Sequence, residues 1–222
     1  MATTIGLTDI TGMIAAVAAL GTAAAGMVDL LKTLPCGGLS HIGYGIIKRR
    51  LKPVATAFAA IGELHPWDTL HANWINGVET GRQKAIAKSL IHLGLTPANA
   101  PGMATAMGID PAALNAAVAN IQKGNALTAQ DTNVLGRFDT MVSAILDAGY
   151  EKASQKYRNW AKLFAAAIAI LLSLGTAYEL GESNLWLAFA IGLVSTPLAP
   201  MAKDLTSSIQ AAAGAVSSVK KV

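Results

Sequence analysis

Positive charge is missing from two long stretches of this 222-residue chain. Its 17 Lys and Arg residues all lie in 32–162 and 203–221, and none lies in 1–31 or 163–202. Only 14% of the residues are charged, whereas a soluble domain usually has about a quarter. Together with a hydrophobic content of 53%, this deficit predicts that lipid forms part of the surroundings of the chain.

The chain also has few of the residues from which catalytic and metal sites are built. Its single cysteine, Cys36, excludes an internal disulfide and a multi-cysteine metal site. The sequence contains no phosphate-binding Gly loop, no nucleophile motif and no paired carboxylates. Aromatic residues make up 5%, too few for base stacking, so nucleic acid is not an expected partner despite the net charge of +4. We expect no enzyme, no metal site and no cofactor.

Three apolar segments are candidates for membrane-spanning helices: 10–32, 161–180 and 185–202. Each is close to the length of about 20 residues that a helix needs to cross the hydrocarbon core. A short acidic turn at 181–184 joins the last two into an antiparallel hairpin. The interiors of these two segments contain no ionisable side chain, so a proton- or ion-coupled transporter is not expected.

Basic residues next to these segments predict their orientation. Lys32 follows the first segment, Lys162 precedes the second and Lys203 follows the third. Because Lys and Arg remain on the cytoplasmic side, the N-terminus is expected outside and the C-terminus inside. The first segment has its positive charge after the apolar run rather than before it, which indicates a retained anchor and not a signal peptide.

The predicted fold is therefore an all-α integral membrane protein with three transmembrane helices, N-out and C-in. A short external N-terminus, 1–9, precedes the first span. A helical cytoplasmic domain, 33–160, lies between the first and second spans, and a weakly amphipathic cytoplasmic tail, 203–222, follows the third. The bilayer, including its anionic inner-leaflet headgroups, is the expected partner.

Several side chains are of the types that anchor a protein at the membrane–water interface. Aromatic rings bracket the second span and mark the outer end of the third, and basic clusters can contact anionic headgroups. For the cluster at 48–52, a simple positive-inside flank explains the charges equally well. The predicted anchors are Lys48, Arg49, Arg50, Lys52, Trp160, Tyr178, Trp186 and Lys203.

The first span carries small residues, Ala18, Gly21, Ala25 and Gly26, close together on a helix. Small residues allow two helices in a membrane to approach closely. Two interpretations stay open and are equally favoured. The small residues either pack inside the protomer's own helices or meet a neighbouring protomer as an oligomer interface.

Helix start and stop residues divide the region 33–160. A helix over 79–93 is expected to end at Gly94 as a C′ residue. Thr96 and Asp110 each precede a proline, which predicts two short helices with these residues as N-caps. The second of these is expected to carry Leu114, Val118 and Ile121 on its apolar face and to end at Gly124.

A long helix is predicted to begin after Thr128, with Asp131 in a capping-box position. No proline follows until after Leu180, so the helix is expected to continue from the cytoplasmic domain into the second span. Its apolar face contains Leu135, Phe138, Val142 and Ile145, and Gly149 is the position where a break is most expected.

The four histidines, His41, His65, His71 and His92, have no metal-ligand spacing. Trp67 and Asp68 lie between two of them and form the only polar–aromatic cluster of the sequence. Packing of aromatic rings at a helix junction is the favoured interpretation of this cluster, ahead of catalysis.

The arrangement resembles a family of uncharacterised bacterial inner-membrane proteins with one N-terminal and two C-terminal transmembrane helices flanking a helical cytoplasmic domain. Two segments carry the resemblance: 138–160, which leads through Tyr157-Arg158-Asn159-Trp160 into the second span, and Pro200-Met201-Ala202-Lys203-Asp204-Leu205. Met201 and Ala202 stand where the family has aromatic residues. The resemblance implies a multi-pass location in a bacterial inner membrane, with the bulk of the polar domain in the cytoplasm, and it implies no activity.

Together these features predict a non-enzymatic inner-membrane scaffold that forms homo-oligomers or serves as an accessory subunit of a larger membrane complex. The alternative is an oligomeric pore-forming or membrane-disrupting effector. In that alternative the channel is lined by Ser173, Thr176, Ser195 and Thr196.

Overall fold

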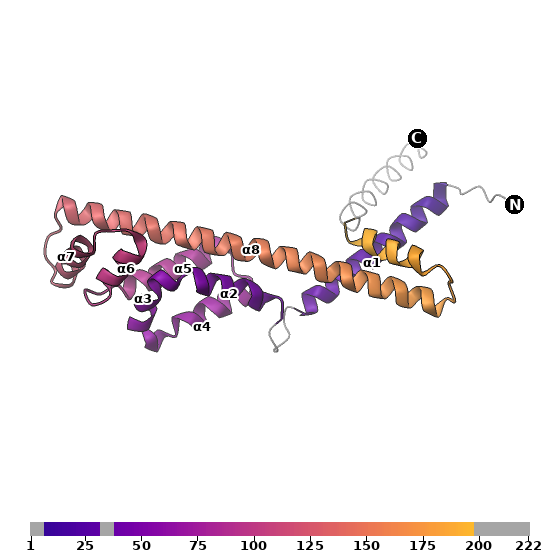
Figure 1. The fold of residues 1–222 in the computed structure, drawn as a ribbon, viewed down its shortest axis with the longest axis horizontal. Coiled ribbons are helices and arrows are strands. Elements are labelled where there is room, and N and C mark those ends of the chain that lie inside the picture. Colours follow the sequence, from indigo (N-terminus) through magenta and orange to yellow (C-terminus); the bar gives the residue numbers. More distant parts are fainter. Residues whose placement is uncertain (1–6, 32–37, 198–222) are drawn as a thin grey trace, which may run out of the picture. The chain divides into compact units, whose positions relative to one another are not determined.

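The computed structural model describes residues 7–31 and 38–197, and every regular element in these ranges is a helix (Figure 1). This confirms the all-α class. The predictions for Cys36, for Lys203 and for the tail 203–222 lie outside the described residues. The elements are α1 Leu7–Leu31, α2 Ser40–Arg50, η1 Lys52–Val54, α3 Ala55–Ala60, η2 Gly62–Leu64, α4 Pro66–Ile75, α5 Thr80–Leu93, α6 Ala100–Met107, α7 Pro111–Gln122 and α8 Ala129–Glu179, followed by the helix Leu185–Pro197.

The chain divides into two compact units, and α8 contributes to both. The first unit, called here the hairpin unit, comprises Met1–Leu34 and Arg158–Val222. The second, the helical unit, comprises Pro35–Tyr157. Each has its own packing, and the two are described separately below.

The core of the helical unit is one apolar cluster to which α2 to α8 all contribute side chains. A stripe of apolar residues with 4-3-4 spacing, Ile47, Leu51, Val54 and Phe58, enters this core, and each of its side chains is at most 1% exposed. The stripe follows α2, a 3-10 turn containing Pro53, and α3, because proline lacks the N–H that a continuous α-helix needs there. Ile61 is only partly buried, since it follows α3 instead of lying within it.

The long helix α8 is continuous over 51 residues, as predicted, and corresponds to about 75 Å of helix. Phe138 and Val142 are fully buried in the helical unit, with Leu135 and Ile145 partly buried beside them. Gly149 does not break the helix. A Cβ at this position would lie 3.3 Å from the Cβ of Arg50, so its missing side chain allows α2 to approach.

The start of α8 is the predicted capping box. The Asp131 main-chain N–H donates to Thr128 Oγ1 at 3.1 Å, and the Asp131 carboxylate accepts from the Thr128 N–H at 3.0 Å. The bond from the Thr128 main-chain N–H first, and then one from the Thr128 hydroxyl to the same carboxylate, lower the pKa of Asp131 below its ordinary value. Asp110 likewise caps α7, because its carboxylate accepts from the Ala112 and Ala113 main-chain N–H groups.

Three local predictions in the helical unit are wrong. No helix begins at Pro97: the Asn99 side chain bonds the Thr96 N–H and the Gly94 carbonyl, which holds a turn, and α6 starts at Ala100. Ile121 is 51% exposed instead of lying on the buried face of α7. The predicted helix end is confirmed, since α5 ends at Leu93, but Gly94 has a φ of −86° and is not a left-handed C′ residue. A Cβ there would lie 2.0 Å from the Ala57 carbonyl oxygen, so close contact with α3 requires glycine.

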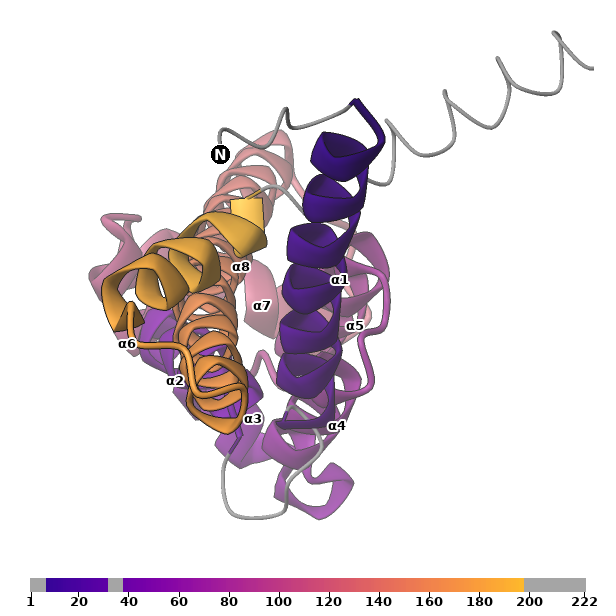
Figure 2. The same cartoon turned by 90° about the vertical axis from the view of Figure 1, so that its right-hand side faces the viewer.

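In the hairpin unit the helix Leu185–Pro197 folds back against the end of α8 (Figure 2). Gly181 has a φ of +68° at the turn, a conformation that glycine adopts without strain. The Ser173 hydroxyl donates to the Ala188 carbonyl at 2.6 Å. A Cβ at Gly192 would lie 2.5 Å from the Ile170 Cα, so the two helix backbones meet at close range.

The contact between Gly94 and Ala57 generates a stability prediction. Gly94→Ala should lower the free energy of unfolding by about 3 kcal/mol, because a main-chain carbonyl cannot move aside as a side chain can. The measurement is chemical unfolding of the full chain, followed by circular dichroism.

Gly102→Ala in α6 is the matched control, because a Cβ at Gly102 meets no atom within 4 Å. It should raise the free energy of unfolding by about 0.5–1 kcal/mol through helix propensity. Equal effects of the two substitutions would contradict the steric explanation.

Candidate functional site

The described part of the hairpin unit has most of its large apolar side chains on the outside. In α1 and α8, the stretches apolar and long enough to cross a membrane are only 22% buried. The core helix of a soluble protein is mostly buried, which these stretches are not. Large apolar side chains that are at least half exposed are Met13, Leu30, Leu163, Leu171, Tyr178, Leu180, Leu185, Trp186, Leu187 and Leu193. Two helices are therefore long and apolar enough to cross a membrane, and most of their apolar side chains are exposed.

The predicted small-residue face of α1 is divided by the structure. Ala18 and Gly21 are buried, whereas Ala25 and Gly26 are exposed. The buried side of α1 continues instead through Ala24 and Val28, which the sequence analysis did not select. Both sets have helical spacing, so periodicity alone could not distinguish them. Ala25 and Gly26 remain available for contact with another helix.

The aromatic anchors predicted around the hairpin are on its surface. Trp186 is 82% exposed and Tyr178 77%, whereas Trp160 is 37% exposed with its ring 6.1 Å from that of Phe164. Amphipathic rings that remain outside a helix pair are typical of the headgroup level of a bilayer.

An apolar groove lies between α1, α8 and the helix Leu185–Pro197. Its volume is about 370 Å³, and only Glu182 and Asn184 near the turn introduce charged or amide groups. The other lining residues are Met13, Ala16, Val17, Leu20, Ser173, Thr176, Ala177, Leu180, Leu187, Ala188 and Ile191. The groove contains no pair of titratable side chains and offers no acid–base chemistry.

The basic anchor residues lie at the end of α2 and immediately after it. Lys48, Arg49, Arg50 and Lys52 are exposed, while Leu51 between them is buried. The cations in the last turn of α2 complement the partial negative charge of its C-terminus. The Lys48 ammonium lies 5.6 Å from the centre of the Trp67 ring, a cation–π arrangement.

Of the histidine and tryptophan cluster of the sequence, Trp67 and His71 pack at a helix junction, whereas His65 and Asp68 are exposed and lie 3.8 Å apart. The Tyr44 hydroxyl donates to the Trp67 carbonyl at 2.6 Å, and His71 lies against Tyr44 and His41 with ring centres 4.6 and 4.9 Å away. Burial, and then the Asp68 carboxylate, raises the pKa of Tyr44 to about 12. Among the described residues no three His, Cys, Asp or Glu side chains are close enough to hold a metal ion.

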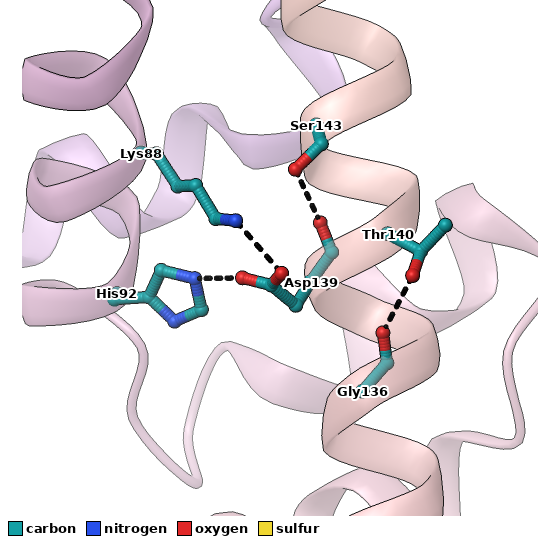
Figure 3. A network of polar contacts seen from close by, with 6 residues as sticks. All are labelled: Lys88, His92, Gly136, Asp139, Thr140 and Ser143. Carbon is teal, nitrogen blue, oxygen red and sulfur yellow. Dashed lines mark hydrogen bonds and ion pairs between the residues drawn. The ribbon is translucent and has the colours of Figure 1, made fainter.

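A polar network that the sequence analysis did not identify joins α5 to α8 (Figure 3). Lys88 Nζ lies 2.7 Å from one oxygen of the Asp139 carboxylate, and His92 Nε2 lies 2.9 Å from the other. Farther along the same helices Lys84 pairs with Asp147 at 2.7 Å. These contacts hold α5 alongside α8, and each charged group in them is paired with another.

The Lys88 hydrogen bond first, and then that of His92, lowers the pKa of Asp139 below its ordinary value of 3.8. The folded state therefore binds this proton more weakly than the unfolded chain does. The resulting stabilisation is present above the unfolded pKa and is lost as the pH falls through the folded one.

Comparison with known proteins gives no match: no family model matches the chain, and no curated protein and no solved structure matches it significantly.

The network around Asp139 generates a pH prediction. Asp139→Asn should lower the free energy of unfolding by about 1 kcal/mol near neutral pH, since the pairs are partly exposed. The difference from wild type should shrink as the pH falls below 3.8, where the wild-type carboxylate also loses its charge. Denaturant unfolding at a series of pH values measures this, with Glu151→Gln, at an exposed position of α8, as the control. A difference that stays constant across the series would exclude the electrostatic origin.

Proposed function

We propose that this chain is a non-enzymatic membrane scaffold that associates with itself or with a larger membrane complex. The observation that carries the proposal is the outward-facing apolar surface of the hairpin unit, where the apolar stretches of α1 and α8 are only 22% buried. A bilayer would cover this surface and a second helix-bearing partner could share it.

The topology belongs to the same proposal. Three spans, 10–32, 161–180 and 185–202, would place the N-terminus outside and both the helical unit and the C-terminus inside. The described part of the third span, Leu185–Pro197, corresponds to about 20 Å of helix, so its full length stays a prediction. The bacterial inner membrane is proposed on the resemblance alone.

A structural role is supported by the Asp139 network and by the junction of Tyr44, Trp67 and His71, where side chains bond or pack against one another instead of lining an open reactive centre. Of the four hydroxyls that the pore alternative would use, three are hydrogen-bonded within the protomer, and that of Thr196 is buried without a hydrogen-bond partner. Ser173 and Ser195 are buried and donate to the Ala188 and Gly192 carbonyls, and Thr176 donates to the Leu172 carbonyl. Three of these hydroxyls thus already serve packing within the protomer, which favours the scaffold over the pore.

Self-association is proposed to use the exposed side of α1 that carries Ala25 and Gly26. A patch of small residues on a membrane helix allows a second helix to approach closely. The van der Waals packing that results stabilises helix association in lipid. Ala18 and Gly21 instead serve packing within the protomer, where they are buried.

The orientation can be tested with single cysteines, because Cys36 is the only native one. In a Cys36→Ser background, Ser183→Cys in the turn should react with a membrane-impermeant maleimide on intact cells. Lys123→Cys in the helical unit should react only after the membrane is opened. The reverse labelling pattern would contradict the proposed topology, and release of the chain by alkaline carbonate would contradict membrane integration altogether.

The oligomer interface can be tested by enlarging one small residue. Ala25→Leu should lower the mass of the detergent-solubilised complex measured by light scattering, because the larger side chain prevents close helix approach. Ala23→Leu is the matched control: it is also exposed but lies about 200° away around the helix. A complex that stays intact in both variants, or a wild-type chain that is strictly monomeric, would contradict this interface.

A further inference from the structure

In the helical unit, three cations line one side of a surface hollow. It has a volume of about 430 Å³ and lies where α2 ends and η1 begins. Within the part of the chain that the structure describes, no carboxylate lines it and none of its three cations forms an ion pair. Its lining residues are Gly45, Lys48, Arg49, Lys52, Ala55 and Trp67.

Trp67 forms a fixed wall of this hollow. Phe58 packs edge-on against its ring with centres 4.6 Å apart, and the Tyr44 hydroxyl holds its main-chain carbonyl. The Lys48 ammonium lies over the ring. A wall held by the core loses little freedom when a ligand arrives, which favours binding.

Gly45 leaves the adjacent side open. A Cβ at this position would meet no atom within 4 Å, so the space beside α2 is empty because the residue has no side chain. A larger residue could occupy that space without a clash with the protein. The position therefore offers a way to close the hollow without disturbing the core.

Two features indicate what the hollow can accept. Three neighbouring cations attract an anion that has several acceptor oxygens, and Arg and Lys are the side chains that bind phosphate. The remaining lining, Gly45, Ala55 and Trp67, is apolar or aromatic. A free phosphate ion has no part that would use such a surface, whereas a phospholipid places its glycerol and first methylenes next to its phosphate.

The cations also have a simpler role, as complements of the α2 macrodipole. That role requires charged side chains in the last turn of α2, but it does not require an open hollow beside them. The partial negative charge at the C-terminus of α2 repels an anion. Binding in the hollow therefore requires that the summed attraction of the three cations exceeds this repulsion.

We propose that this hollow binds the phosphate of an anionic phospholipid headgroup, with Lys48, Arg49 and Lys52 around the phosphate and Trp67 beside the glycerol region. The proposal rests on the proposed function, because it requires the helical unit to face a membrane surface. It adds one defined lipid site to the general attraction between basic residues and the inner leaflet.

Native mass spectrometry of the full chain in a neutral detergent tests the site. Wild type should retain one phosphatidylglycerol in preference to phosphatidylcholine. Lys48→Gln should weaken this retention by about fivefold, and Gly45→Leu, which fills the hollow, by about tenfold or more. Lys123→Gln, at the end of α7, and Gly136→Leu, at another open helical glycine, should leave retention unchanged.

Gly45→Leu should unfold at or above the wild-type temperature, since leucine favours helix more than glycine does. If this variant fails to fold, the pair Lys48→Gln and Lys123→Gln decides alone. Equal retention by wild type and folded Gly45→Leu, or equal retention of the two lipids by wild type, would overturn the proposal. Displacement of the lipid by glycerol phosphate at similar concentration would overturn the lipid assignment in favour of a soluble phosphate.

Failure of the site and failure of the proposed function give different results. Loss of the lipid preference in a chain that still resists carbonate extraction would remove the site alone. Extraction of the wild-type chain by carbonate would remove the proposed membrane function, whatever the mass spectrum shows.

Discussion

The uninterrupted main-chain hydrogen bonding of α8 is the constraint on which both units depend. Over its first part the helix contributes Phe138 and Val142 to a protein core, and over its last part it exposes Leu171 and Tyr178. The apolar residues of one helix are thus buried in a core along its first part and exposed along its last. The helical unit packs α2 to α7 around the first part, and the hairpin unit adds α1 and the helix Leu185–Pro197 beside the last.

Close approach of backbones is the second recurrent device. Gly94 lets the end of α5 meet the Ala57 carbonyl, and Gly192 lets the last described helix meet the backbone of Ile170. In both places a methyl group added to the glycine would clash with the backbone of the neighbouring helix and keep the two elements apart. Hydroxyl and amide side chains then bond the carbonyls nearby, as Asn99 does at Gly94 and Ser173 at Ala188.

Features determined by neighbouring residues could be predicted from the sequence, and features determined by distant ones could not. The capping box at Thr128, the cap at Asp110 and the continuity of α8 follow from spacing within a few positions. Other features depend on segments that are farther apart along the chain. These are the turn held by Asn99, the close contact that requires glycine at position 94, and the pairing of Lys88 and His92 with Asp139. For the candidate sites, the run of basic residues at 48–52 could be recognised in the sequence itself. The wall formed by Trp67 and the open side at Gly45 could be recognised only in the folded structure.

The bond between Ser173 and Ala188 has a consequence for biosynthesis. A hydroxyl facing lipid alone is unfavourable, but here it already has its partner within the same hairpin. The turn after α8 is short, so the two helices can pair as soon as both have left the ribosome. In the proposed bilayer, the hairpin would then leave the translocation channel sideways as one preassembled element. If the two helices were inserted separately, the Ser173 hydroxyl would first bond a carbonyl of its own helix, as Thr176 does with Leu172, and would have to exchange that bond when the second helix arrived.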